Sequence, residues 1–448
     1  MASYRAPREW EDWIGWLAAG LHGRNRWRLA AVMMGVLFAG GRRVVAAWIR
    51  TAGVSDDYRD YYFFLQSVGR RWTEMGRRVL VLVLRVALKD QQRVLVAIDD
   101  SPTKRYGSKV QGAGIHHDPT PGPTGHAFCY GHVWVTLAVI VRHAKWGTIG
   151  LPIWSWLYVR KCDVAKMPAR HKWTFQTKLP QAADLVLRAV ETLHPVASKG
   201  AGKDVWVVTD GAYTKRPFVR PALELGVTLV GRLRKDAALF DLPPRETKQR
   251  RGRKRKYGKN RLSLAKRAAH PHGWQEVTCS VYGSEVVKHV KTFLATHRTF
   301  GGTIRVVIVL EKTGPQFFYC TDTTASVSAI LAAFADRAAI EQVFHDVKEV
   351  WGSGQQQVRN VWTNIAVWHL NLWMHTLTEL WAWRRSAKQL VHRSDSPWDD
   401  AQRRPSHADR RKALQAACLQ QELTHTLPAT SVPPKIKHLL QRLLRIAI

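Results

Sequence analysis

Apolar side chains repeat with two different periods along this chain, and the period changes near residue 91. Residues 1–90 place them at helical spacing, as in Trp10, Ile14 and Leu17, which predicts amphipathic helices. Residues 91–210 instead carry short runs rich in β-branched side chains, which are typical of strands buried on both faces, and further strands are predicted within 211–333. The predicted strands are 94–98, 133–141, 205–208, 228–231, 276–282, 304–310 and 316–321. The predicted later helices are 179–193, 326–351 and 361–383.

Two predicted helices in the N-terminal part are joined by a short turn. They cover 43–51 and 58–68, with Gly53 in the turn. Ser55 and two aspartates precede the second helix, and such a sequence favours a helix start. A pair of this kind is consistent with a helix-turn-helix DNA reader, and an ordinary helical hairpin is the alternative.

The charge of the chain indicates the class of partner. The 448 residues include 46% hydrophobic ones, which excludes a disordered basic tail, and carry a formal net charge of +35. A field of this sign attracts polyanions, with nucleic acid the first candidate and an anionic membrane surface the second. The charge is densest in residues 245–267, where 12 of 23 residues are Lys or Arg and one is acidic. This run is either a solvated loop or a DNA-backbone contact, and its density favours the contact.

Several other classes of protein and site are disfavoured. The five cysteines are far apart and form no C-x-x-C pair, so we expect no disulfide framework and a reducing compartment. The start of the chain shows no secretory signal, and the apolar stretches 29–41 and 365–383 are respectively too short and too polar to span a membrane. No P-loop or G-x-S-x-G elbow occurs. The histidines and Cys129 within 116–132 lack a recognised zinc spacing.

Acidic residues stand where metal-dependent chemistry is expected. Asp99 and Asp100 end the first predicted strand, Asp210 ends the third, and Glu341 lies in the long helix that follows the strands. Ligands gather at strand ends in α/β sheets, and carboxylates together with substrate phosphates hold Mg²⁺. Two such ions about 3.5–4 Å apart serve in-line phosphoryl displacement. Taken singly, an Asp at a strand end is more often a turn residue and a Glu on a helix a solvated one, so the surrounding pattern decides.

The helix around Glu341 carries cations on the same face. Phe334, Arg337, Glu341 and Lys348 are separated by three, four and seven residues, so they share one side of a helix. A carboxylate flanked by Arg and Lys suits a site for metal and phosphate, because Arg grips a phosphate through two parallel hydrogen bonds. The alternative is two weak helical ion pairs.

This pattern resembles the cut-and-paste DDE transposases of bacterial insertion sequences, in the group marked by a Tyr-x2-Arg-x3-Glu-x6-Lys signature. The four residues around Glu341 match that spacing throughout, with Phe334 in place of Tyr. The segments 94–107 and 206–213 are similar to the family's first and second aspartate blocks. The resemblance covers about residues 91–383. It implies an α/β fold with a ribonuclease-H-like mixed sheet and flanking helices, interrupted by a mostly β insertion subdomain, with helical N- and C-terminal regions.

The resemblance also implies roles for individual residues. Asp100, Asp210 and Glu341 would be the catalytic residues and the ligands of two Mg²⁺ ions, with Mn²⁺ as a possible substitute. The family places its first aspartate directly before Ser or Thr, which favours Asp100 beside Ser101. Strand alternation leaves Asp99 open, because the strand is predicted to be buried on both faces. The residues expected to hold DNA are Arg337, Lys348, Phe334, Arg250, Arg251, Arg253, Lys254, Arg255, Lys256 and Trp274.

Two of these DNA contacts carry a reservation. Phe334 has no hydroxyl, so only stacking or packing is expected of it. Trp274 is either a core residue or a platform for a flipped base, and the core is the commoner place for a tryptophan.

The function implied is that of a DNA transposase. It would bind the inverted-repeat ends of its mobile element and catalyse metal-dependent strand cleavage and strand transfer through the DDE triad. It would act as a homodimer on double-stranded DNA, in the cytoplasm at the nucleoid and with no membrane partner. The alternatives are a ribonuclease-H-fold nuclease without a mobile element and a non-catalytic, transposase-derived DNA-binding regulator.

The expected division of the chain follows the changes in composition. The segments are 1–90, a helical DNA-binding region; 91–210, the first part of the catalytic core; 211–333, a β-rich basic insertion; 334–383, the second part of the core with the Glu helix; and 384–448, a helical basic C-terminal region.

Overall fold

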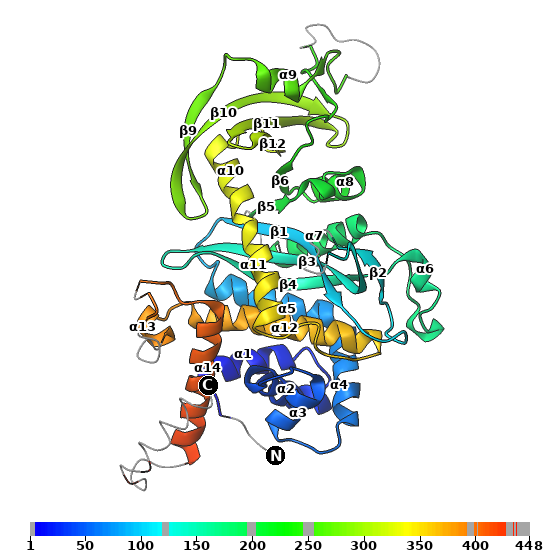
Figure 1. Cartoon of the computed structure of the whole chain (residues 1–448), viewed down its shortest axis with the longest axis vertical. Helices are drawn as coiled ribbons and strands as arrows, with labels where there is room; N and C mark the ends of the chain where they lie inside the picture. Colours follow the sequence, from blue (N-terminus) through cyan, green and yellow to red (C-terminus); the bar gives the residue numbers. More distant parts are fainter. Residues whose placement is uncertain are drawn as a thin grey trace.

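The computed structural model describes residues 5–118, 125–194, 203–244, 255–391, 398–400, 402–426, 433 and 436. In this part of the chain, helices gather at one end of an elongated molecule and a large sheet occupies the middle and the other end (Figure 1). The N-terminal helices are α1 (Arg8–Ala18), α2 (Arg26–Phe38), α3 (Val45–Ala52), α4 (Arg59–Arg70) and α5 (Trp72–Val86).

One mixed sheet of twelve strands runs through the described residues. Its order is β2-β3-β1-β5-β6-β12-β11-β10-β7-β8, with β4 paired to β3 and β9 paired to β10. The strands of the first half are β1 (Arg93–Lys104), β2 (Gly114–His117), β3 (Phe128–His143), β4 (Gly147–Tyr158), β5 (Asp204–Thr209) and β6 (Thr228–Arg232). Strands β1, β5 and β6 are parallel, whereas β3 is antiparallel to β1. This mixed α/β arrangement is consistent with the predicted ribonuclease-H-like fold.

Strand alternation gives this part of the sheet two differently covered faces. On one face, Val96 and Ile98 of β1 belong to the main core, which also contains the apolar side of α7 (Lys178–Leu193). On the other face, Ala97 of β1 and Val208 of β5 pack with Ile340 in a second cluster. The helices over this second face are α10 (Val327–Asp336) and α11 (Ala338–Glu349), which cross in front of the sheet in Figure 1. Neighbouring residues of β1 therefore face different environments.

The sheet continues past β6 into the strands predicted between 211 and 333. These are β7 (Leu239–Phe240), β8 (Arg261–Leu262), β9 (Gln275–Val281), β10 (Ser284–His297), β11 (Gly302–Glu311) and β12 (Gly314–Cys320), accompanied by α8 (Arg216–Glu224) and α9 (Leu264–Ala269). Strand β6 pairs in parallel with β5 and antiparallel with β12. Backbone hydrogen bonds therefore join the strands that precede residue 211 and those that follow it into one sheet, although the composition changes at that residue.

Helix α12 (Val361–Ala382) lies at the centre of the helical end. All of its residues except Trp362 are buried, because it packs against α2, α4 and α5 as well as β4. This confirms the prediction of a buried helix here, and none of the helices described has the length and apolar character to cross a membrane. Helix α4 approaches so closely that a Cβ on Gly69 would lie 1.8 Å from the carbonyl oxygen of Trp362.

The helical pair predicted around Gly53 is present as α3 and α4. Gly53 ends α3 in the left-handed conformation, with φ 60°, which is why a glycine stands at this turn. The apolar face of α4 contributes Tyr61, Phe64 and Leu65 to the core. This face attaches the pair to the rest of the molecule.

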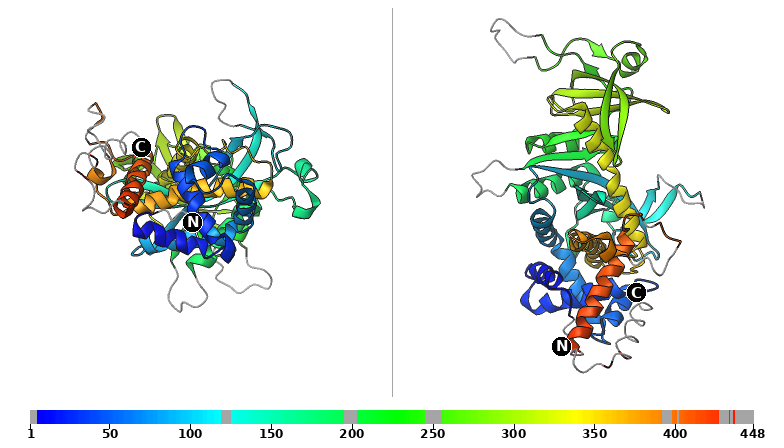
Figure 2. Two further views of the ribbon diagram at one scale, coloured as in Figure 1. Left: turned by 90° about the horizontal axis from the view of Figure 1, so that it is seen from below. Right: turned by 90° about the vertical axis from the view of Figure 1, so that its left-hand side faces the viewer.

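The remaining helices differ in part from the sequence prediction. The segment 326–351 forms two helices, α10 and α11, on either side of Arg337. Ser326 caps α10 by accepting a hydrogen bond from the Ala329 amide at 3.1 Å. The C-terminal part contains α13 (Ala387–Leu390) and α14 (His407–Thr426), and a short helix α6 (Lys161–Val164) follows β4. Figure 2 shows α14 running beside the N-terminal helices and α12.

Candidate active site

Asp99 and Asp210 stand side by side on adjacent parallel strands. The last registered residue pair of β1 and β5 directly precedes them, and neighbouring strands lie about 4.8 Å apart. Their side chains continue the series of Ala97 and Val208, which faces α10 and α11. The two carboxylates therefore emerge on the same face of the sheet.

Arg337 joins Glu341 to the first of these carboxylates. Its guanidinium donates one hydrogen bond from Nη1 to Asp99 Oδ2 and one from Nη2 to Glu341 Oε1, both at 2.8 Å. The i,i+4 spacing on the helix supplies the second bond, and the passage of α11 over β1 supplies the first (Figure 1). The Glu341 side chain is 60% exposed, so the group is open to a large substrate.

Asp100, the expected first carboxylate, lies on the opposite face of the sheet from Asp99. Its carboxylate accepts hydrogen bonds from Lys178 Nζ at 2.7 Å and from Tyr213 Oη at 3.1 Å. It continues the series of Ile98, which packs in the main core. The position next to Ser101 favoured Asp100, but adjacent residues of a strand point to opposite faces. Asp99 is the residue that accepts a hydrogen bond from Arg337, which also binds Glu341.

One group on each face of the sheet has a strongly shifted pKa. Burial raises the pKa of Asp99 to about 6, with Asp210 and Asp100 adding to the rise and Arg337 opposing it. A buried carboxyl among like charges at a strand end is typical of a functional site. On the other face, burial and the nearby Asp100 raise the pKa of Tyr213 well above its usual range. The Tyr213 hydroxyl therefore stays protonated and donates to Asp100.

The carboxylate group fits a hard divalent cation. Asp99 and Glu341 converge on the positive guanidinium of Arg337. Asp210 uses Oδ1 to accept the Ala212 amide at 2.8 Å, and its other oxygen has no donor among the residues described. Oxygen-only sites of this kind suit Mg²⁺ or Mn²⁺.

Two predicted DNA-binding residues of the Glu helix lie at different distances from the carboxylates. Phe334 packs edge-on against Phe318 at 4.9 Å, and the Arg337 guanidinium lies 5.6 Å from its ring, so it supports the arginine. Lys348 lies about 10 Å further along α11 than Glu341, at 1.5 Å rise per residue. Burial lowers its pKa, and Asp118 opposes this shift. The structure does not bring Lys348 to the carboxylates.

The predicted contacts in the basic run fall only partly within the described chain. Arg250, Arg251, Arg253 and Lys254 lie outside the described residues, whereas Arg255 and Lys256 are described and exposed.

Trp274 is half-buried at the border of the core. The Lys291 ammonium lies 4.5 Å from its ring centroid. Its ring is therefore already in contact with a cation of the chain.

A second group of titratable side chains, missed by the sequence analysis, is buried where α11, α12 and α14 meet. Asp346, His375 and His407 have ligand atoms within 4.8 Å of one another. Yet both nitrogens of His407 are engaged, since Nδ1 lies 2.6 Å from Glu379 Oε1 and Nε2 accepts the indole N–H of Trp351 at 2.7 Å. The two histidine rings also stack at 4.0 Å and 18°, so their in-plane lone pairs do not converge on one ion. This group forms a structural network.

The network is completed by a buried ion pair. Arg410 Nη1 donates to Glu379 Oε2, and both side chains are nearly inaccessible. Arg410 and His407 hold the pKa of Glu379 far below its usual range against the opposing effect of burial, which is the largest single influence. The sequence carried a signal in the polar residues of the segment 361–383, which include His375 and Glu379 four residues apart.

Comparison with known families places the chain in a family. The sequence model of the DDE superfamily endonucleases matches residues 17–299 of the 448-residue chain, and the chain belongs to this family. The matched segment includes Asp99 and Asp210 and ends before α11 with Glu341. No curated protein matches the chain. Membership of this family points to nuclease or transposase chemistry on DNA with a divalent metal.

Proposed function

We propose that this protein is a DNA transposase that binds the inverted-repeat ends of its mobile element and catalyses strand cleavage and strand transfer. Asp99, Asp210 and Glu341 form the catalytic triad in this proposal, in place of the set with Asp100. The observation that carries it is the Arg337 guanidinium bridging Asp99 and Glu341 on the face where Asp210 also emerges. The Tyr/Phe-x2-Arg-x3-Glu-x6-Lys spacing supports a place in that transposase group.

The residues divide the chemical work between them. Asp99, Asp210 and Glu341 hold two Mg²⁺ or Mn²⁺ ions, because three carboxylates offset most of the charge of two dications. When bound, the ions stabilise charge on the attacking and leaving oxygens of the phosphodiester. Arg337 holds the carboxylates in position and presents a fork of N–H donors suited to a phosphate. The ring of Phe334 lies 5.6 Å from that guanidinium.

DNA binding is assigned to the exposed cations outside the carboxylate group. Residues 245–267, which include Arg255 and Lys256, supply the densest positive charge. Lys348, which is half-buried at the C-terminal end of α11, is assigned a DNA contact away from the carboxylates. Each phosphate contact steepens the salt dependence of binding. Pairing of two ends by a homodimer on DNA is part of the proposal, and the mass of the protein–DNA complex measures it.

The test uses the purified full-length chain, Mg²⁺ and a duplex carrying the inverted repeats that flank its gene. Wild type is expected to cut at the repeat ends, and Asp99→Asn, Asp210→Asn and Glu341→Gln are each expected to abolish cutting while binding persists. Glu349→Gln is the matched control, because Glu349 is an exposed carboxylate on the same helix. Cutting should therefore survive in that variant.

The outcomes separate the proposed function from its alternatives. Equal cutting of DNA without repeats indicates a nuclease with no mobile element, and specific binding without cutting in Mg²⁺ or Mn²⁺ indicates a regulator. Asp100→Asn decides the first carboxylate. If this variant loses cutting while Asp99→Asn retains it, the triad assigned here is wrong.

A further inference from the structure

The helical hydrogen bonding changes where α10 ends and α11 begins, next to the residue that bridges the carboxylates. The Arg337 amide donates to the Phe334 carbonyl at 3.3 Å, and the Ile340 amide donates to the Arg337 carbonyl at 3.0 Å. Both bonds span three residues instead of four, a tighter pattern with poorer hydrogen-bond geometry that often marks a hinge within a helix. Backbone bonds therefore hold the direction of α11 less firmly here than within either helix.

Asp336, the last residue of α10, is bound to the sheet by both of its carboxylate oxygens. Arg142 Nε donates to Oδ2 at 2.7 Å, and Thr148 Oγ1 donates to Oδ1 at 2.8 Å. Arg142 and Thr148 are partners across β3 and β4. The Asp336 side chain is 7% exposed, so water competes little for these bonds. A buried carboxylate thus fastens the joint between the two helices to β3 and β4.

Asp336 and Arg337 are neighbours in the chain but are held at different points of the sheet. Arg337 contacts Asp99, whose partner on β3 is Thr136. Arg142 stands six residues after Thr136 on the same strand, or about 20 Å away at about 3.4 Å per residue. Two attachments this far apart fix a direction as well as a position, so α11 cannot swing without breaking one of them.

Close packing of α11 on β4 adds to this attachment. A Cβ on Gly150 of β4 would lie 2.9 Å from the carbonyl oxygen of Ala339 and 2.6 Å from Val343 Cγ2, both on α11. The first turns of α11 therefore rest directly on the strand that carries Thr148.

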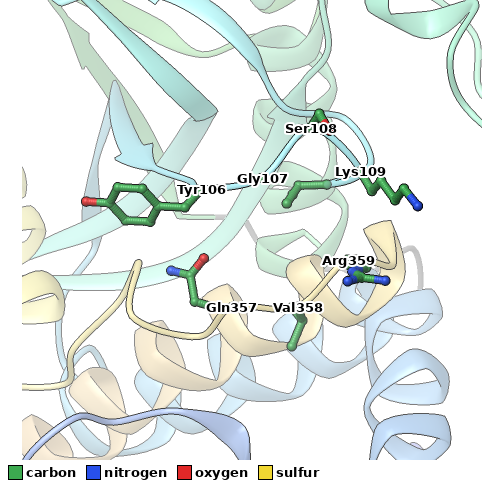
Figure 3. Close-up of a pocket in the computed structure, with 8 residues that line it drawn as sticks. Tyr106, Gly107, Ser108, Lys109, Gln357, Val358 and Arg359 are labelled. Atoms are coloured by element: carbon green, nitrogen blue, oxygen red, sulfur yellow. The ribbon is translucent and has the colours of Figure 1, made fainter.

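The C-terminal end of α11 is held by a different part of the molecule. Arg43 Nη1 donates to the Glu349 carbonyl at 3.0 Å. The chain beyond this end leads to residues 357–359, which form one wall of a pocket of about 380 Å³ (Figure 3). Glu341 stands in the first turn of α11, at the end that Asp336 holds.

We infer that Asp336 is a positioning residue of the proposed active site. It fixes the joint between α10 and α11, and through this joint it holds Arg337 against Asp99 and places Glu341 as a metal ligand. Both of its oxygens are already bound to β3 and β4, so it acts through its neighbours and not as a ligand itself. The inference rests on the proposed function for the identity of the ligands. Removing groups that orient metal ligands typically lowers metal affinity or activity by about 10–100-fold.

Mn²⁺ binding to the full-length protein without DNA, measured by electron paramagnetic resonance, tests this role apart from cutting. Asp336→Ala is expected to weaken Mn²⁺ binding by about tenfold. Thr148→Val removes one of the two bonds at nearly constant side-chain size and should weaken binding less. Because both substitutions act on one contact, the double variant should bind Mn²⁺ no more weakly than Asp336→Ala alone. In cutting assays, Asp336→Ala should need more Mg²⁺ for half-maximal rate and should recover most of the wild-type rate at saturating Mg²⁺.

Asp163 provides the matched control. Its carboxylate is also buried and also accepts two hydrogen bonds, from Arg160 at 2.6 Å and from Lys166 at 3.0 Å. It lies in α6, beyond the end of β4 opposite to Thr148. Asp163→Ala should lower the melting temperature about as much as Asp336→Ala does, and it should leave Mn²⁺ binding unchanged.

The outcomes separate a positioning role from a general loss of stability. Wild-type Mn²⁺ affinity in Asp336→Ala, or an equal loss in Asp163→Ala, overturns the inference. A cutting rate that is lower at every Mg²⁺ concentration, with no change in the concentration for half-maximal rate, also overturns it, as does a wild-type protein that binds no Mn²⁺. If the wild type binds Mn²⁺ but leaves the repeat ends uncut, the proposed function is wrong, and Mn²⁺ binding by the variants still decides the role of Asp336.

Discussion

The buried pair of Glu379 and Arg410 is predicted to be a major attachment of α14 to α12. The two side chains are 2% and 7% exposed, so solvent screens their attraction little. Removing one partner of such a pair leaves an uncompensated buried charge and costs about 3–5 kcal/mol. Glu379→Gln and Arg410→Met keep the size of the side chains while each removes one charge.

The two substitutions together define a double-mutant cycle. Because the double variant buries no unpaired charge, its cost is expected to fall short of the sum of the single costs by at least about 2 kcal/mol. Hydrogen exchange of the α14 amides measures this locally and avoids assuming two-state unfolding of a 448-residue chain.

An exposed ion pair provides the control. Glu74→Gln breaks the contacts to Arg77 and Arg78 on α5, where Arg77 is 46% exposed, and is expected to cost only about 0–1 kcal/mol. Single costs below about 1 kcal/mol at Glu379 and Arg410, or costs that simply add in the double variant, would show that the network does not couple the helices.

Three further predictions follow from buried groups. A metal chelator should leave the amide hydrogen exchange of α14 unchanged, because both ring nitrogens of His407 already have hydrogen-bond partners. Faster exchange in the chelator would identify Asp346, His375 and His407 as a metal site. Burial lowers the pKa of His369 to about 4, so the unfolded chain takes up this proton first, near pH 6.5. The free energy of unfolding should be highest above that pH and fall by roughly 3 kcal/mol towards pH 4. In His369→Gln the urea midpoint should change less with pH than in the wild type. An unchanged dependence of the midpoint on pH would contradict the assignment. Gly69→Ala should lower the melting temperature, because its Cβ would lie 1.8 Å from a carbonyl oxygen. Gly15→Ala, at an exposed position of α1 with nothing within 4 Å of the new Cβ, should raise it slightly. Equal effects of the two substitutions would refute the close approach at Gly69.

The sequence pattern predicted the elements whose burial is uniform. Runs such as 205–208 and 361–383 became β5 and α12 because continuous burial selects apolar residues at every position. Strand β10 was not predicted, because the first six residues of Ser284–His297 are exposed or half-buried and form no continuous apolar run. The break at Arg337 was also missed, since both flanking segments keep helical spacing.

The candidate site could not be predicted from the sequence alone, because it depends on which residues of neighbouring strands and helices lie side by side. The sequence places Asp99 and Asp100 next to each other, and only the coverage of each sheet face separates their roles. Arg337 was predicted near Glu341 from local spacing, whereas its bond to Asp99 joins residues 238 apart in the chain. The His407 network likewise joins three helices through partners that no local pattern connects.

The continuous sheet fixes the distances between its strands along the molecule. Nine strand-to-strand steps separate β2 from β8, or about 43 Å along the sheet at about 4.8 Å per step. That corresponds to roughly 13 base pairs at about 3.4 Å each. Backbone hydrogen bonds join the strands at every step, so the carboxylates at the ends of β1 and β5 and the strands β7 and β8 beyond β10 keep set intervals. A DNA end with a different spacing between its contacts would have to bend or twist to fit. The sheet would thereby select DNA ends by the spacing of their contacts.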